Sequence, residues 1–265
     1  MEPTNGGTYV YRGTAKLKRG DIDKAMADYD RAIEINPKNS VAYTCRAEAK
    51  LKKEDWGGVI TDCNKAIELN PKDNAAYVDR GVAKREQGNL AGAINDYNQA
   101  IEFNPNDGIA YENRGSAKKC QSDLEGAIAD FDKAVELNST NAIYYNNRGW
   151  AEFLNGDLNS AMADANRAIQ INPNDGHAYG TRGWTRYSSG DISGAVEDCK
   201  KAVELSKKGS LSIPFDEGLL NFIAGDYHQA ITNWQNVLQK DMTLKFELQP
   251  WIDKAQAKLS AEKPK

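Results

Sequence analysis

A fixed period of 34 residues constrains this chain more than any other feature. Pro37, Pro71, Pro105 and Pro173 follow that period, and Ser139 stands at the one position between them that lacks proline. Around each position the chain repeats Tyr-x-x-Arg-Gly, Gly-Asp, Ala-x-x-Asp and Ala-Ile-Glu-x-Asn-Pro, with small variations. A period of this length is typical of stacked helix pairs.

Each repeat carries one apolar stripe on each of two helices. In the first repeat, Tyr9 and Gly13 share one helix face, and Ala25, Tyr29 and Ala32 share a face of the next helix. Neither helix buries its stripe alone, but stacking the next repeat does. The sequence therefore predicts an all-α fold, an α-solenoid of stacked antiparallel helix pairs.

The turn inside each repeat has its own local signal. Gly20 is expected to adopt a positive φ that ends the first helix, and Asp21 is expected to cap the second. The second repeat has Glu54 in place of that glycine, followed by Asp55. The boundaries therefore follow from local chemistry as well as from the period.

The repeated motifs resemble the tetratricopeptide repeat (TPR) family over roughly Gly6 to Gly209. The resemblance implies one domain over residues 1–265, a right-handed α-solenoid. Its regular repeats are expected at 6–39, 40–73, 74–107, 108–141, 142–175 and 176–209. After a loop at 207–214 the motif returns one residue late, which predicts a degenerate repeat at 211–243 with helices at 215–224 and 227–239. A capping helix is expected at about 244–259, and the tail from 260 to 265 is expected to be disordered.

Two columns of opposite charge recur in every regular repeat. They are Arg12, Arg46, Arg80, Arg114, Arg148 and Arg182 on the first helix, and Asp28, Asp62, Asp96, Asp130, Asp164 and Asp198 on the second. We expect a structural ladder of ion pairs rather than a charged ligand track, because matched charges neutralise each other.

A third column is basic in the early repeats and changes sign later. It contains Lys16, Lys50, Lys84 and Lys118, and then Glu152. We interpret the lysines as aliphatic stems that cover the interface and place their ammonium groups in water. A phosphate-binding groove is the alternative.

Several function classes find no support in the sequence. A net charge of −4 argues against nucleic-acid binding, and no apolar run approaches the length of a membrane span. His177 and His228 lie in different repeats, and no histidine or cysteine cluster has metal-ligand spacing. No Gly-rich phosphate loop is present either. We therefore expect no catalytic residues, no metal and no cofactor.

The compartment is not specified by the sequence. Four separated cysteines and an N-terminus without signal-peptide character favour the cytoplasm. The chain begins almost inside its first predicted helix, as a segment of a longer protein would.

The TPR resemblance implies a concave groove lined by the first helix of each repeat. Trp150 and Trp184 occupy the same position in adjacent repeats, beside amide side chains. Paired aromatic rings next to amides suit an extended peptide or a partner helix, although the tryptophans could also fill gaps between helices. The candidate binding residues are Asn113, Asn146, Asn147, Trp150, Phe153, Thr181, Trp184 and Tyr187.

Some TPR proteins bind the C-terminal carboxylate of chaperones through a clamp of lysine, asparagine and arginine. Asn113 and Asn147 match its asparagine. The basic positions of the clamp instead hold Ile109, Ile143, Asn146 and His177. We therefore expect a protein-interaction scaffold with a different partner. The alternative is a non-catalytic targeting or substrate-recruiting domain of a larger enzyme or of a secretion or assembly factor.

Overall fold

The computed structural model describes residues 5–262 of the chain. They fall into two compact units: unit 1 ends at Ala117 and unit 2 begins at Lys118. The sequence predicts one continuous domain. A solenoid has no central core, because each repeat contacts only its neighbours. The boundary between the units lies inside the fourth repeat, residues 108–141.

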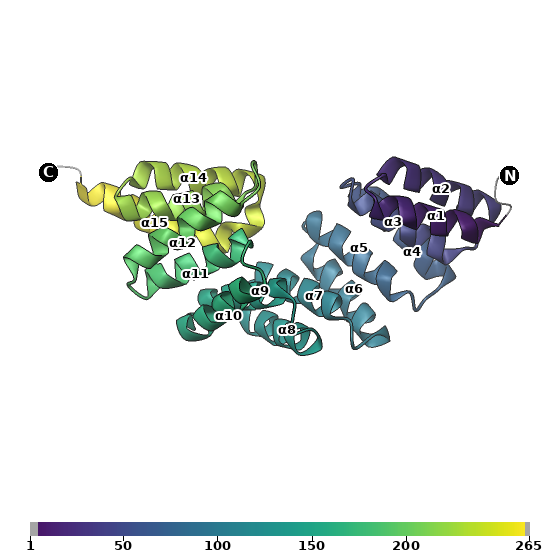
Figure 1. The fold of residues 1–265 in the computed structure, drawn as a ribbon, viewed down its shortest axis with the longest axis horizontal. Helices are drawn as coiled ribbons and strands as arrows, with labels where there is room; N and C mark the ends of the chain where they lie inside the picture. The colour runs from purple at the N-terminus through teal and green to yellow at the C-terminus, as the bar shows by residue number, and fades with distance from the viewer. Residues whose placement is uncertain (1–4, 263–265) are drawn as a thin grey trace. The chain divides into compact units, whose positions relative to one another are not determined.

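Unit 1 consists of antiparallel helix pairs, one pair to each 34-residue repeat (Figure 1). Its helices are α1 (Gly6–Lys18), α2 (Ile22–Ile35), α3 (Ser40–Leu51), α4 (Trp56–Leu69), α5 (Asn74–Glu86) and α6 (Leu90–Phe103). Helix α7 (Gly108–Cys120) continues the series, and its last turn belongs to unit 2.

Unit 2 continues the same pattern and ends in a helix that belongs to no pair. Its helices are α8 (Leu124–Leu137), α9 (Ala142–Leu154), α10 (Leu158–Ile171), α11 (Gly176–Ser188), α12 (Ile192–Leu205), α13 (Ser212–Ala224), α14 (Tyr227–Lys240), the 3-10 helix η1 (Met242–Leu244) and α15 (Lys245–Glu262). The described residues form helices and turns without strands, and consecutive helices pack together, which confirms the predicted all-α solenoid class.

The termini of these helices follow the local signals of the sequence. Gly20 has φ of +83° and Gly88 has φ of +78°, whereas Glu54 adopts φ of +58° although it is not glycine. The carboxylate of Asp55 accepts a hydrogen bond from the amide of Gly58 at 2.9 Å and caps α4. Asp21 precedes α2 without making such a bond.

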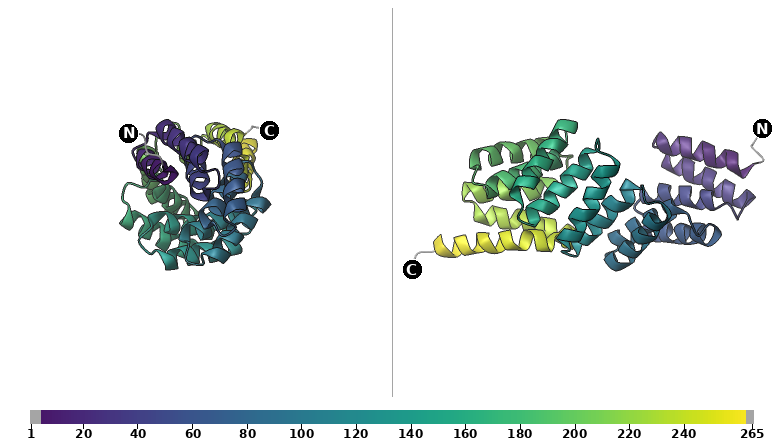
Figure 2. Two further views of the ribbon diagram at one scale, coloured as in Figure 1. Left: turned by 90° about the vertical axis from the view of Figure 1, so that its right-hand side faces the viewer. Right: turned by 90° about the horizontal axis from the view of Figure 1, so that it is seen from below.

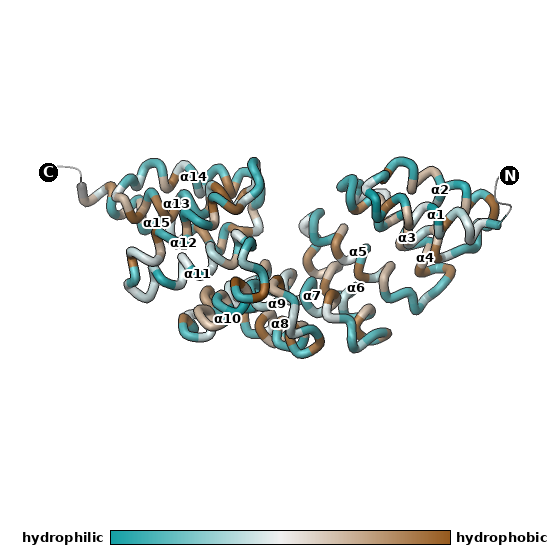
Figure 3. The backbone as a smooth tube through the Cα atoms, in the orientation of Figure 1, coloured by the Kyte–Doolittle hydropathy of each residue, from teal (hydrophilic) through white to brown (hydrophobic). Residues whose placement is uncertain are grey.

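In several pairs, a glycine on the first helix faces a large ring of the second, whereas Gly183 faces the smaller Cys199. A Cβ atom on Gly13 would lie 2.6 Å from the ring of Tyr29, which is fully buried. In the degenerate repeat, a Cβ on Gly218 would lie 2.1 Å from Trp234. Figure 3 shows apolar and polar segments alternating along each helix, as one-sided burial requires.

The C-terminal segment departs from its predicted boundaries at both ends. Helix α13 begins at Ser212 rather than at 215, because Pro214 needs no hydrogen-bond acceptor in a first turn. Helix α15 reaches Glu262, so residues 260–262 are helical and not disordered. The expectation for residues 263–265 lies outside the described part of the chain.

Helix α15 contributes to the core of unit 2. Leu248, Ile252 and Ala255 are buried in one cluster with Trp184, Leu219 and others. Figure 2 shows α15 in yellow beside the other C-terminal helices. This last helix therefore closes the stack, as terminal elements of solenoids do.

Candidate functional site

The repeated arginines and aspartates lie close together within their repeats. In the second repeat, Arg46 donates from Nε and Nη2 to the two carboxylate oxygens of Asp62, at 2.8 and 2.6 Å. The same two-bond geometry joins Arg12 to Asp28, Arg80 to Asp96, Arg148 to Asp164 and Arg182 to Asp198. The Arg46 guanidinium also lies over the ring of Tyr43, at 5.6 Å. These charges are paired inside the fold, which leaves them little capacity to form a ligand track.

The third column joins the same pairs, which corrects our expectation of ammonium groups in water. Lys50 Nζ lies 2.8 Å from Asp62, and Lys84 Nζ lies 2.7 Å from Asp96. Lys16 and Lys118 make the same contact with Asp28 and Asp130. Because these nitrogens are bound to buried carboxylates, the column does not form a phosphate-binding groove.

Glu152 breaks this arrangement in the fifth repeat. Its side chain is 12% exposed, and Oε2 makes no hydrogen bond within residues 5–262. Arg148 lies 4.0 Å from Glu152 but only 2.6 Å from Asp164, so two carboxylates share one guanidinium. Burial, and then repulsion from Asp164, raise the pKa of Glu152 to about 7.

Trp184 is not on an open wall of a groove, as the sequence analysis expected. It is 1% exposed, and its ring lies 5.2 Å from that of Phe215 and 5.1 Å from that of Trp251. Phe215 belongs to α13 and Trp251 to α15, two elements outside the regular repeats. Trp184 therefore belongs to the core of unit 2, which was the alternative interpretation of this tryptophan.

Phe153 and Tyr187 also face the interior of unit 2. Phe153 is buried beside Trp150, with ring centroids 4.9 Å apart. Tyr187 is half-buried against Phe222 and Trp251, at 6.1 and 5.6 Å. Phe153 is therefore buried in the core of unit 2 and Tyr187 packs partly against it, and their role in binding stays a prediction.

Asn113 lies in unit 1, apart from the other candidates along the chain. It is buried, donates to the carbonyl of Ile109 at 2.9 Å and accepts from Arg85 at 3.2 Å. Both hydrogen bonds are internal to unit 1, so the structure uses this amide to join α5 and α7.

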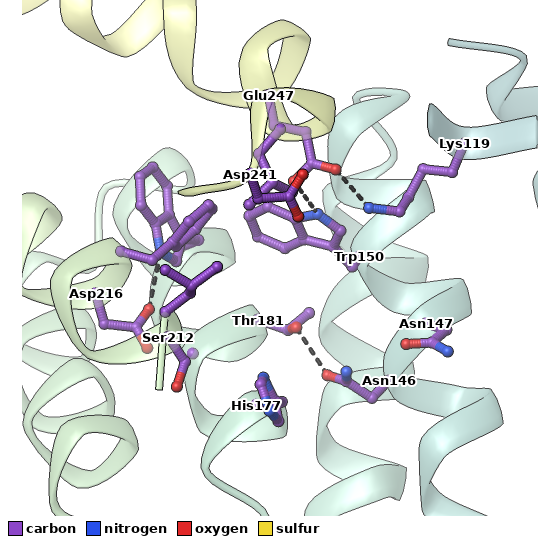
Figure 4. A pocket seen from close by; sticks show the side chains of 15 residues that line it. Lys119, Asn146, Asn147, Trp150, His177, Thr181, Ser212, Asp216, Asp241 and Glu247 are labelled. Atoms are coloured by element: carbon purple, nitrogen blue, oxygen red, sulfur yellow. Dashed lines mark hydrogen bonds and ion pairs between the residues drawn. The ribbon is translucent and has the colours of Figure 1, made fainter. Parts of the chain in front are cut away.

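The remaining candidates meet at a pocket of about 300 Å³ in unit 2. It is lined by Lys119, Asn146, Asn147, Trp150, His177, Gly180, Thr181, Trp184, Leu211, Ser212, Phe215, Asp216, Asp241, Leu244 and Glu247. Figure 4 shows Asp216 and Ser212 on one side and Asn146 and Asn147 on the other. Helices α7, α9 and α11 supply one part of the lining, and α13, η1, α15 and the adjoining residues Leu211 and Asp241 supply the rest.

Polar side chains brace the pocket from within. Glu247 forms an ion pair with Lys119 and accepts a hydrogen bond from the indole of Trp150 at 2.9 Å. Thr181 donates to Oδ1 of Asn146 at 2.8 Å, so these contacts join α7, α9, α11 and α15. The amino group of Asn146 makes no hydrogen bond within the described residues and remains available as a donor.

Asp216 is a buried carboxyl group of the lining that has no cationic partner within the described residues. It is 3% exposed and accepts one hydrogen bond, from the indole nitrogen of Trp184 at 3.1 Å. Burial raises the pKa of Asp216 to about 7, and the Trp184 hydrogen bond offsets only part of that rise.

Sequence reasoning missed Asp216 and Glu247 as members of this site. Each belongs to an element that departs from the regular repeat, so no repeated column points to it. The apolar residues Leu248, Trp251 and Ile252 were the only signal that α15 packs against the solenoid.

Models of one repeat family match this chain in four places. Tetratricopeptide repeat models match residues 8–39, 112–176 and 176–208, and a TPR repeat model matches residues 81–119. The chain belongs to the tetratricopeptide repeat family. Together with the helix pairs of both units, this confirms the resemblance noted in the sequence.

Solved structures share the TPR fold with this chain at low sequence identity. A chain of the APC/C hetero-tetramer Cut9-Hcn1 is 16% identical with a TM-score of 0.72, and the match covers 80% of this chain but 42% of that one. A tetratricopeptide repeat protein from Parabacteroides merdae is 18% identical with a TM-score of 0.70, over 95% and 98% of the two chains. YrrB, a TPR protein with an unusual peptide-binding site, is 19% identical with a TM-score of 0.55, over 71% and 97%. At these identities the likeness concerns the fold.

No curated protein matches the chain in sequence. Within the described residues, no helix is both long enough and apolar enough to cross a membrane. The same residues contain no group of three or more histidine, cysteine or acidic side chains that could hold a metal ion.

Proposed function

We propose that this TPR protein is a protein-interaction scaffold and that unit 2 binds a peptide segment in its pocket. The observation that carries the proposal is the pocket itself, where an aromatic face and an unused amide donor meet. Trp150 is half-buried and offers ring surface, and Asn146 keeps its amino group free for a peptide carbonyl. Aromatic anchors in a partly desolvated pocket supply much of the affinity of such interfaces.

The proposal also draws on the TPR family, whose members are generally non-catalytic scaffolds. YrrB, which shares the fold, has a peptide-binding site. The pocket differs from an open groove because α13 and α15 cover part of the inner face. It therefore suits a short segment of a partner better than a long helix.

The test is a peptide selection followed by a variant comparison. Peptides selected from a displayed random library by the intact chain are measured against the wild type and Trp150→Ala. Truncating an interface anchor costs about 2 kcal/mol, so Trp150→Ala should weaken binding roughly thirtyfold. Trp56→Ala is the matched control in unit 1 and should leave affinity unchanged. Full affinity in Trp150→Ala would refute the pocket as the binding site.

A recruiting role inside a larger enzyme or assembly factor is the second candidate. It is favoured by the likeness to a chain of the Cut9-Hcn1 hetero-tetramer, of which this chain spans 42%. The size of the complex purified from native cells distinguishes a stable assembly from a transient peptide contact.

A further inference from the structure

We propose that the pocket of unit 2 accepts the basic side chain of a lysine or arginine in the bound peptide, with Asp216 as its counter-ion. This inference rests on the proposed function and names the chemistry that the site selects.

Asp216 lacks what other buried aspartates of this chain possess. Asp62, Asp96 and Asp198 each contact two cationic side chains. Asp216 is as deeply buried, yet within residues 5–262 its only polar contact is the neutral indole N–H of Trp184. A buried carboxylate without a cation is costly, and a cation from a ligand would remove that cost.

The rest of the lining has the same electrostatic preference. Lys119 and Glu247 pair with each other, and His177 is exposed to solvent. Asp216 and Asp241 therefore remain as the acidic groups of the lining that have no cationic partner within the described residues. Asp241 accepts hydrogen bonds from Thr243 and has no ion pair within the described residues. A ligand carboxylate would be repelled here, whereas a cation would be attracted.

The aromatic part of the lining favours the same ligand. The rings of Trp150 and Phe215 lie 5.6 Å apart, and those of Trp184 and Phe215 lie 5.2 Å apart. Aromatic faces attract ammonium and guanidinium groups, and their apolar surface accommodates the methylene stem.

The size of the pocket suits one long side chain. Its volume of about 300 Å³ lies at the lower end of the range for ligand sites. Gly180 keeps space open beside the counter-ion, since a Cβ there would lie 3.1 Å from both carboxylate oxygens of Asp216. The geometry therefore places a carboxylate and an aromatic wall around a single basic side chain.

The indole N–H signals in NMR spectra of the full chain provide the test. The probes are acetyl-Gly-Lys-Gly-amide, its arginine analogue, and the norleucine and glutamate analogues, which replace the charge. The lysine and arginine peptides should shift the signals of Trp150 and Trp184 saturably and leave Trp56 unchanged. The norleucine and glutamate peptides should bind at least tenfold more weakly.

A variant of Asp216 tests whether its carboxylate is the counter-ion. Asp216→Asn should weaken binding of the lysine peptide at least tenfold without affecting the weak binding of the norleucine peptide. Glu217→Gln is the matched control, because it removes one carboxylate from the next position of α13, outside the pocket lining. If Asp216→Asn does not fold, the lysine and norleucine comparison on the wild type still decides the question.

Three results would overturn the inference. Equal affinities for the norleucine and lysine peptides would show that the pocket binds peptides without discriminating by charge. The cation site would then be wrong, and the proposed peptide-binding function would not be affected. Unchanged affinity of Asp216→Asn for the lysine peptide would show that Asp216 is not the counter-ion. Absence of any indole shift with the basic peptides would also reject the cation site. The peptides selected from the random library test the proposed function independently.

Discussion

Glu152 shows how much one residue can change inside a repeated framework. At its position, neighbouring repeats use Lys118 or Arg186 to neutralise the buried aspartate of the second helix. Glu152 instead adds a second carboxylate beside Asp164 and makes the fifth repeat sensitive to pH.

The sign of this sensitivity follows from the raised pKa. The pKa of Glu152 is about 7 in the folded protein, against an ordinary value of 4.5. Between these values the folded state holds a proton that the unfolded state has released, so stability falls as pH rises through this window. Relative to Glu152→Gln, the wild type should lose about 2 kcal/mol of unfolding free energy between pH 5 and pH 8.

Urea unfolding of both proteins at the two pH values checks this prediction. Burial also raises the pKa values of Asp79 and Asp216 to about 7, so only the difference between wild type and variant isolates Glu152. A difference that stays constant with pH would contradict it. Glu152→Lys, which restores the column, should be the most stable of the three at pH 8.

At the scale of one element, the turn between α3 and α4 contains a conformational conflict. Glu54 is exposed and adopts φ of +58°, where most repeats of this chain have glycine. The left-handed conformation costs a residue with Cβ roughly 1–2 kcal/mol. The greater freedom of glycine in the unfolded chain offsets part of that cost.

Glu54→Gly should therefore stabilise the second repeat by roughly 0.5–1 kcal/mol. Amide hydrogen exchange in α3 and α4 measures the effect at the affected repeat. Lys53→Gly is the control, because Lys53 is not among the residues with positive φ, and it should destabilise the same helices. Faster exchange in Glu54→Gly would show that the turn is not strained.

The helix elements could be predicted because their signals repeat, whereas the site could not. Tyr29 and Ala32 have counterparts in other repeats, and the period alone placed both helices of each pair. Trp184 was assigned to an open groove because no local pattern distinguishes a tryptophan that faces solvent from one that a later segment covers. The covering residue Trp251 lies on α15, which has no counterpart in the repeats. Asp216 and Glu247 lie outside the regular repeats, so their roles emerged only from the packing.

At the scale of the whole molecule, the terminal helix should hold unit 2 together. Deleting residues 245–265 removes Leu248 and Ile252 from the core, and each buried aliphatic side chain contributes about 1.5–3 kcal/mol. Trp184 and Phe222 would then be exposed to water. Hydrogen exchange in α11 and α13 should accelerate strongly.

Unit 1 provides an internal reference for this deletion. Because solenoid stability depends on nearest neighbours, exchange in α3 and α5 should not change. Deleting only residues 260–265 is the matched control and should leave both units as they are. Unaltered exchange in α11 after the longer deletion would show that α15 does not support the core.

The aromatic cluster of unit 2 also gives the molecule an uneven spectroscopic signature. Of five tryptophans, Trp150, Trp184, Trp234 and Trp251 belong to unit 2, and the ring of Trp184 lies 5.1–6.1 Å from each of the other three. Rings this close exchange excitation energy and couple their transitions in the near ultraviolet. Tryptophan fluorescence should therefore report mainly on unit 2, because Trp56 is the one tryptophan of unit 1. An unfolding curve recorded from total tryptophan emission would therefore describe mainly the unfolding of unit 2.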